Sequence, residues 1–179
     1  MTWIAIRALL TEQVRTLTPA NFGMVMASGI VSLAADQAGL RMLAIGLFVL
    51  AGVAYVVLWV FTAIRVARYP RSVFHDLIDH LRGPGFFTKV AATGILGSET
   101  MLLFGAVNGA MVLLFVATCL WLFFIYTIFT ALTVKEEKPG LETGISGAWL
   151  LAVVATQSIA VLSALVASHV EQPWRLVLN

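Results

Sequence analysis

Residues 19–31 read PANFGMVMASGIV, and residues 84–96 read PGFFTKVAATGIL. The two stretches lie 65 residues apart and share six identical and two conservatively exchanged residues over thirteen positions. A fainter third copy follows 63 residues later, over residues 153–159, and Gln157 there takes the place of the repeated glycine. Self-similarity at a fixed spacing is the signature of a repeated structural unit. The sequence therefore predicts an architecture built from copies of one unit.

The repeats belong to a strongly apolar chain. Of its 179 residues, 60% are hydrophobic and 11% are charged, against about 45–50% and about 25% in soluble domains. Crossing a bilayer takes roughly 20 helical residues, and four intervals of this order lack any Asp, Glu, Lys, Arg or His. They are residues 16–35, 42–64, 100–134 and 143–168. The fold class predicted from this pattern is an all-α membrane protein.

The third interval is too long for one helix, and Asn108-Gly109 offers it a turn. Five transmembrane helices are then expected, near residues 20–38, 41–66, 86–106, 110–133 and 144–168. The repeat unit becomes a helical hairpin, so the chain holds two and a half hairpins. The first, third and fifth spans carry small residues and are expected to be inner helices, whereas the bulky second and fourth suit lipid.

Orientation follows from the loop cations, because Lys and Arg that flank spans stay on the cytoplasmic side. With a cytoplasmic N-terminus, only Arg41 and Arg175 fall outside. Residues 1–17 then form a cytoplasmic interfacial helix, residues 18–168 the transmembrane region and residues 169–179 an extracytoplasmic tail. The nine cations on the cytoplasmic side are Arg7, Arg15, Arg65, Arg68, Arg71, Arg82, Lys89, Lys135 and Lys138.

Small and hydroxyl-bearing residues recur at equivalent depth in the inner spans. Neutral hydroxyls can hydrogen-bond a partly dehydrated solute without trapping it, which conduction requires. Small residues also let helices pack closely, and this is the alternative interpretation for any single glycine. The candidates for lining a pore are Ser28, Gly29, Thr93, Gly94, Thr156 and Gln157.

Two charged residues fall inside the third span. Lys89 is close enough to the cytoplasmic surface to snorkel outward, or it faces a pore mouth and attracts anions. Glu99 lies past the middle of the span, where an ionised carboxylate costs about 3 kcal/mol or more. Glu99 therefore needs a proton, a cation from elsewhere or a watery vestibule. Lys89 is the candidate at an anion mouth, and Glu99 is an intramembrane acid.

Other classes of site fit the sequence poorly. Residues 75–80 contain two His and two Asp, but Arg71 and Arg82 flank them, and a solvated interfacial turn is favoured over a metal site. The single Cys119 can form neither a disulfide nor a Cys-based metal site within one chain. The basic residues lie between apolar runs, which is a membrane pattern and not a nucleic-acid one. We expect no cofactor and no enzyme, the alternative being an intramembrane enzyme that uses Glu99 and the loop histidines.

Three segments carry a family resemblance: LTPANFGMVMASGIV at residues 17–31, RGPGFFT at residues 82–88 and GAWLLAVVATQ at residues 147–157. With them the chain resembles the tellurite-resistance/C4-dicarboxylate transporter family, which includes malic acid transporters and plant slow anion channels. The resemblance implies ten helices in five hairpins of pseudo-fivefold symmetry, with odd helices around a central pore. It also implies trimers in which each protomer passes anions such as C4-dicarboxylates, chloride, nitrate, sulfite or tellurite.

The chain departs from that family pattern by stopping at Asn179, before a sixth span. The gating phenylalanine of the family lies on the ninth helix, so it has no counterpart here. The function expected from the resemblance is part of an anion channel or carrier. The alternative is a non-conducting truncated fragment or accessory protein that binds a partner through its inner helices. The expected partners are the lipid bilayer, small anions and a missing C-terminal half or further copies of the chain, with a homotrimer possible.

Overall fold

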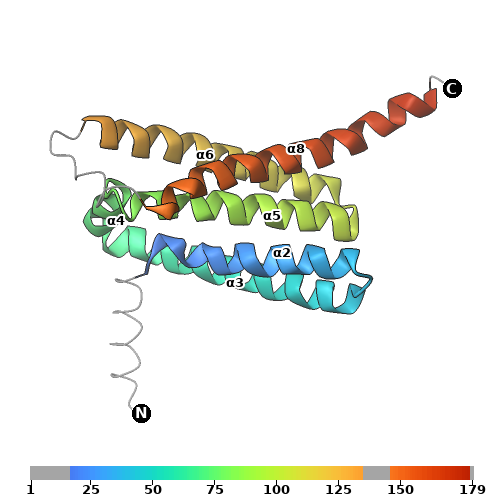
Figure 1. Ribbon diagram of the computed structural model, residues 1–179, viewed down its shortest axis with the longest axis horizontal. Coiled ribbons are helices and arrows are strands. Elements are labelled where there is room, and N and C mark those ends of the chain that lie inside the picture. Colours follow the sequence, from blue (N-terminus) through green and yellow to red (C-terminus); the bar gives the residue numbers. More distant parts are fainter. Residues whose placement is uncertain (1–16, 135–145, 178–179) are drawn as a thin grey trace, which may run out of the picture.

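The computed structural model describes residues 17–134 and 146–177, with side chains described as far as His169. Helices and turns make up these residues, with no strand among them (Figure 1). Residues 1–16 of the expected interfacial helix lie outside the description, and so do the tail side chains beyond His169. Four of the loop cations fall in the parts that are not described, namely Arg7, Arg15, Lys135 and Lys138, and the side chain of Arg175 is not described either.

The first hairpin pairs α2 with α3. A 3₁₀ turn that begins at Pro19 leads into α2, and proline suits a first helical position because its missing N–H would have no partner there. Gly39 closes the hairpin with a φ of 78°, a left-handed conformation that glycine adopts without steric cost. The elements of this part are η1 (Pro19–Phe22), α2 (Gly23–Gln37), α3 (Arg41–Arg68) and the short α4 (Pro70–Leu77).

The second hairpin repeats this plan with η2 (Gly83–Phe86), α5 (Phe87–Phe104) and α6 (Val107–Val134). Its turn is formed by Gly105, which has a φ of 61° and stands 66 residues after Gly39. The amide of Gly105 donates to the carbonyl of Met101 at 2.9 Å, as is common where a helix ends in a left-handed residue.

The turn expected at Asn108-Gly109 is therefore misplaced by about three residues. Both residues lie in the first turn of α6, which begins at Val107. The reason is that Gly105 supplies the left-handed conformation the reversal needs, whereas Gly109 has no positive φ. The dipeptide looked like a turn by composition, but the backbone reverses at the earlier glycine.

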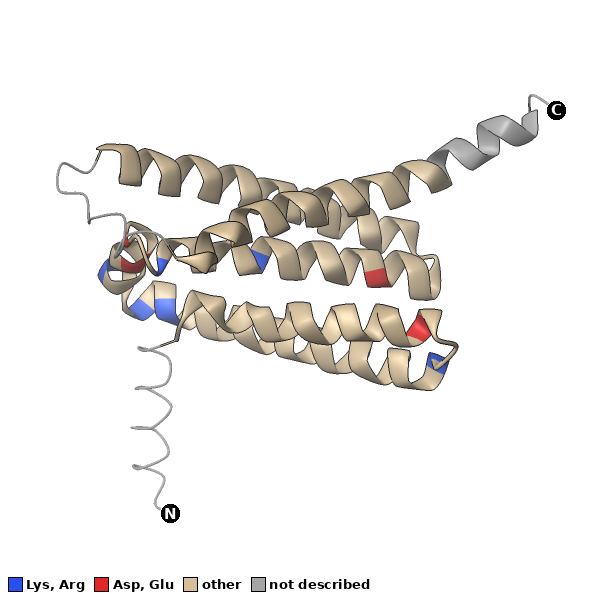
Figure 2. Ribbon diagram, in the orientation of Figure 1, with Lys and Arg blue, Asp and Glu red and all other residues tan. Residues whose placement is uncertain are grey.

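The third unit consists of η3 (Gly147–Trp149) and α8 (Leu150–Val177). In the bundle, α5 lies between α2 and α8, α3 packs on α2, and α6 packs on α5 and α8 (Figure 1). The long helices run side by side, and charged residues gather mainly at the ends of the bundle, most densely at the end that holds α4 (Figure 2). This separation of charge from the middle of the helices suits a bilayer.

Burial sets α5 apart from the long helices α3 and α6. Fourteen of the 18 residues of α5 are buried, against five of 28 in α3 and five of 28 in α6. By length and composition α3, α6 and residues 147–169 could each cross a membrane. The many exposed valine, leucine and phenylalanine side chains of α3 and α6 form the kind of surface that faces lipid.

Candidate functional site

Outer helices hold the inner helix of the next unit through a contact that occurs twice. The hydroxyls of Tyr55 on α3 and Thr93 on α5 are 2.8 Å apart. Trp121 on α6 donates its indole N–H to the hydroxyl of Thr156 on α8 at 2.9 Å. Trp121 follows Tyr55 by 66 residues and Thr156 follows Thr93 by 63, so both contacts occupy the same place in the repeat. We name this pairing the aromatic–hydroxyl joint.

A double-mutant cycle tests the first aromatic–hydroxyl joint. Combining Tyr55→Phe with Thr93→Val should give a coupling energy of about 0.6–1.7 kcal/mol, the range of interhelical hydrogen bonds in membranes. The measurement is reversible unfolding in mixed detergent micelles. Tyr126, 70% exposed on α6, supplies the control: Tyr126→Phe should not couple to Thr93→Val. Strictly additive effects of the Tyr55 and Thr93 variants would contradict the joint.

A second repeated contact brings neighbouring inner helices together at glycine. A Cβ built on Gly29 of α2 would lie 2.6 Å from Cγ2 of Ile95 on α5. A Cβ built on Gly94 of α5 would lie 2.6 Å from the hydroxyl oxygen of Ser158 on α8. Ile95 and Ser158 are again 63 residues apart. Glycine at these positions allows an approach that any larger residue would obstruct.

These contacts place the six pore-lining candidates in different surroundings. Gly29, Thr93 and Gly94 are buried between helices, so for both glycines the structure shows close packing. Ser28 is half-buried on α2. The remaining two candidates are exposed on α8 in the described chain: Thr156 and Gln157.

Lys89 lies inside the bundle. Its side chain is 5% exposed, and it precedes Thr93 by one helical turn, so both residues are on the side of α5 that faces α3. The Lys89 amino nitrogen lies 4.6 Å from the ring centroid of Phe86 and 5.6 Å from that of Phe22. Trp59 on α3 adds a third ring at 5.8 Å. Cation–π contacts of this kind stabilise a buried ammonium, so of the two alternatives left open by the sequence, snorkelling to the surface does not occur.

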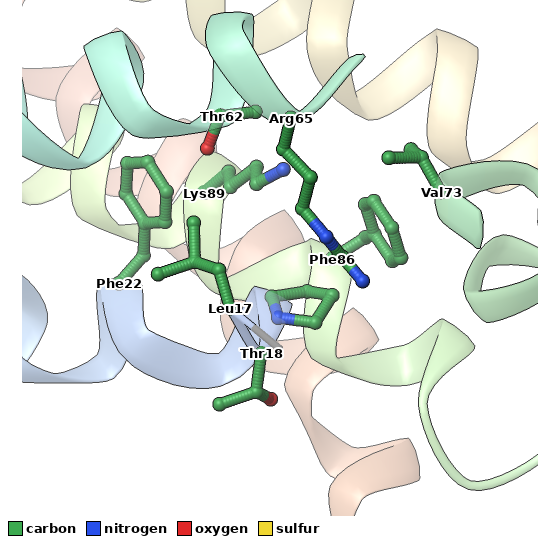
Figure 3. A pocket seen from close by; sticks show the side chains of 9 residues that line it. Leu17, Thr18, Phe22, Thr62, Arg65, Val73, Phe86 and Lys89 are labelled. Atoms are coloured by element: carbon green, nitrogen blue, oxygen red, sulfur yellow. The ribbon is translucent and has the colours of Figure 1, made fainter. Parts of the chain in front are cut away.

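Lys89 shares a small pocket with Arg65 (Figure 3). The walls come from η1 and the residues just before it, from α3 and α4, and from η2 and the start of α5. Thr62, one turn before Arg65 on α3, adds a buried hydroxyl to the lining. The room inside is about that of a single water molecule. The pocket thus gathers two cationic groups and a hydroxyl around one small space.

Asp76 on α4 forms ion pairs with two arginines at this end of the bundle. Its carboxylate accepts from Arg65 at 2.6 Å and from Arg82 at 3.0 Å. The expectation of a solvated turn is wrong for Asp76, which is 5% exposed, because α4 packs against α3 and brings the carboxylate onto buried Arg65. His75 is exposed. The described residues contain no group of three or more His, Cys, Asp or Glu arranged to hold a metal ion.

Glu99 is fully enclosed where α5 meets α2. Neither carboxylate oxygen has a hydrogen-bond partner among the described residues, and a Cβ on Gly29 would lie 2.9 Å from one of them. Ser32 on α2 is near Glu99, but its hydroxyl hydrogen is directed to the carbonyl of Ala44 at 2.9 Å. The watery vestibule left open by the sequence is therefore not what surrounds Glu99. A proton or a cation has to compensate a carboxyl group in such a site.

Sequence reasoning missed the side chains that organise these sites. Tyr55 and Trp121 stand at equivalent repeat positions in otherwise apolar spans, and their polar tips were the available signal. Arg65 was counted only as a loop cation, although it is 4% exposed. Its burial depends on α4 folding back, which hydropathy does not predict.

A family described as voltage-dependent anion channel matches residues 16–179, a range that contains every described residue. No curated protein and no solved structure matches the chain.

Proposed function

The chain belongs to the voltage-dependent anion channel family, whose members are membrane anion channels and transporters, and from this premise we propose that it forms part of a pathway for small anions. The observation that carries the proposal is the family match over residues 16–179. The proposed cargo is a C4-dicarboxylate, tellurite, sulfite, nitrate or chloride. The repeated inner and outer helices supply the framework that such a pathway needs.

We propose that all five long helices cross the bilayer. As a helix, α2 has only 15 residues, or about 22 Å. The four residues of η1 add about 8 Å at its start. The sum is about 30 Å, the thickness of the hydrocarbon core. The same reasoning applies to α5 with η2, which together are longer.

The proposed lumen borders α2, α5 and α8 on the side away from α3 and α6. On α5, Ile95 and Glu99 face α2, Gly94 faces α8 and Thr93 faces α3. By helical spacing, the remaining side of α5 is the one that carries Leu102, which is 47% exposed, and this side faces the proposed lumen. Ser28 and Gln157 remain candidates for lining the lumen, whereas Thr156 contacts Trp121 on α6 as Thr93 contacts Tyr55 on α3. Because three inner helices form an arc, further helices have to complete the wall, from a C-terminal half or from other copies.

Electrostatics favours anions at the end that holds α4. Arg68, Arg71 and Arg82 are exposed there. The inner helices begin at this same end, and helix N-termini carry partial positive charge. Summed positive potential of this kind concentrates anions at a mouth and speeds their entry.

Cysteine labelling tests the proposed orientation, with the N-terminus cytoplasmic and the C-terminus extracytoplasmic. In a Cys119→Ser background, Met42→Cys and His169→Cys should react with a membrane-impermeant maleimide added outside intact cells. Arg71→Cys should react only after the cells are opened. The expectation rests on the asymmetry of the loop cations. Labelling of Arg71→Cys from outside, with Met42→Cys protected, would reverse the orientation.

The alternative function is a non-conducting accessory protein that binds a membrane partner. The exposed Gln157 on α8 favours it, since a polar side chain on an inner helix seeks a partner in hydrocarbon. Members of the family form trimers, and we propose that lipid and neighbouring copies cover the apolar surfaces of α3 and α6. Reconstitution separates the two functions, as set out in the Discussion.

A further inference from the structure

We propose that the pocket between Lys89 and Arg65 binds one small monovalent inorganic anion of chloride size, as a fixed structural ligand outside the conduction pathway. This goes beyond transport, because the pocket lies on the side of α5 that faces α3 (Figure 3). The anion would join the first hairpin to the start of the second.

The first step of the argument is the charge of Lys89. Lys89 as a residue is 5% exposed, and its ammonium makes no ion pair or hydrogen bond with the described residues. Its contacts are the rings of Phe22, Trp59 and Phe86. A cation–π contact is worth roughly 0.5–2 kcal/mol, whereas removing a charge from water costs several times more. Lys89 therefore has unused capacity for an anionic partner.

The second step is the neighbourhood of that ammonium. Arg65, 4% exposed, faces the same pocket and repels Lys89 electrostatically. Asp76 accepts from Arg65 and Arg82, which leaves Lys89 without an acid of its own among the described residues. A bound anion would turn the repulsion between Lys89 and Arg65 into two attractions.

The third step is the size and chemistry of the space. The pocket holds little more than one water-sized group, which excludes dicarboxylates, phosphate and lipid headgroups. Besides the two cations, Thr62 offers a hydroxyl donor from the buried side of α3. A compact halide ion can accept from ammonium, guanidinium and hydroxyl donors, so it matches the groups that line this pocket.

The test is the chloride dependence of stability in detergent. For the whole chain, replacing gluconate with chloride should raise the unfolding temperature saturably, by about 3–6 °C at tenfold the dissociation constant. Lys89→Met should remove this increment. Methionine is a reasonable substitute because Met24 occupies the equivalent position in the first repeat. Arg71→Met, which removes an exposed cation from the same end, should keep the increment.

An undiminished chloride increment in Lys89→Met would overturn the proposal, because the ion would then bind elsewhere, for example in the lumen. Two further measurements serve if Lys89→Met does not fold. Thr62→Val should weaken the chloride effect several-fold, and bromide soaked into crystals of the unmodified chain should give an anomalous peak between Lys89 and Arg65. Ordered water alone at that position, with bromide present, would equally overturn it. None of these readouts depends on anion flux.

Discussion

Replacing Gly94 by leucine is expected to separate α5 from α8 and to destabilise the helical bundle by about 1–3 kcal/mol or more. A Cβ at this position would lie 2.6 Å from the hydroxyl oxygen of Ser158, 2.9 Å from its Cβ and 3.2 Å from its backbone carbonyl carbon. Backbone atoms of a packed helix cannot be moved by a change of rotamer, so the two helices have to part. The measurement is reversible unfolding in mixed micelles.

Gly52 on α3 provides the matched control, because no heavy atom lies within 4 Å of a Cβ built there. Leucine gains about 1 kcal/mol of helix propensity over glycine at either position, so this gain cancels in the comparison. Gly52→Leu should leave stability unchanged or slightly raised. If Gly94→Leu proves as stable as Gly52→Leu, the inner helices do not approach one another at the repeated glycines.

The equivalent contact between α2 and α5 limits which residues can replace Gly29. There the first obstacles are the side chains of Ile95 and Glu99, which can move more readily than a backbone. Substitutions at Gly29 should therefore be milder than at Gly94. The sequence makes both glycines candidates for lining a pore, and their surroundings explain why small residues in inner helices can instead serve the approach of two helices.

Much of this architecture could be predicted from the sequence because membrane helices follow simple rules. Long uncharged intervals and a 65-residue repeat gave helices close to the observed bounds of α3 and α6, whereas α8 runs to Val177, nine residues past the expected end at residue 168. The small residues of α5 indicated an inner helix, and α5 is the most enclosed of the long helices described. Hydropathy and local composition carry this information directly.

The site was less predictable, because it depends on which side of a helix meets which neighbour. Thr93 is a candidate for lining a pore and Lys89 a candidate for a pore mouth, yet α5 directs them to Tyr55 and to the aromatic rings around the pocket. Composition alone could not fix the rotation of α5 about its axis. The equivalent positions of Tyr55 and Trp121 in the repeat are the sequence signal for that rotation, because each marks the side of its outer helix that meets the next inner helix.

Anion flux is expected to need more helices than α2, α5 and α8. In the described residues, the inner helices α2, α5 and α8 form an arc, and three helices at about 8–10 Å spacing cannot enclose a hydrated pore. The exposed polar groups of α8 would each cost about 1–2 kcal/mol in hydrocarbon without a partner. The purified chain alone should therefore leave flux at the level of empty liposomes, whereas helices that complete the ring should raise it far above that level.

The most direct test of an anion pathway is efflux from liposomes that contain this chain co-purified with the C-terminal half of a family member. The account predicts chloride or malate efflux well above that of either part alone, and loss of that efflux with Gly94→Leu but not with Gly52→Leu. A stable co-purified complex that passes neither chloride nor malate above the background of empty liposomes would contradict it, and would favour the non-conducting accessory role.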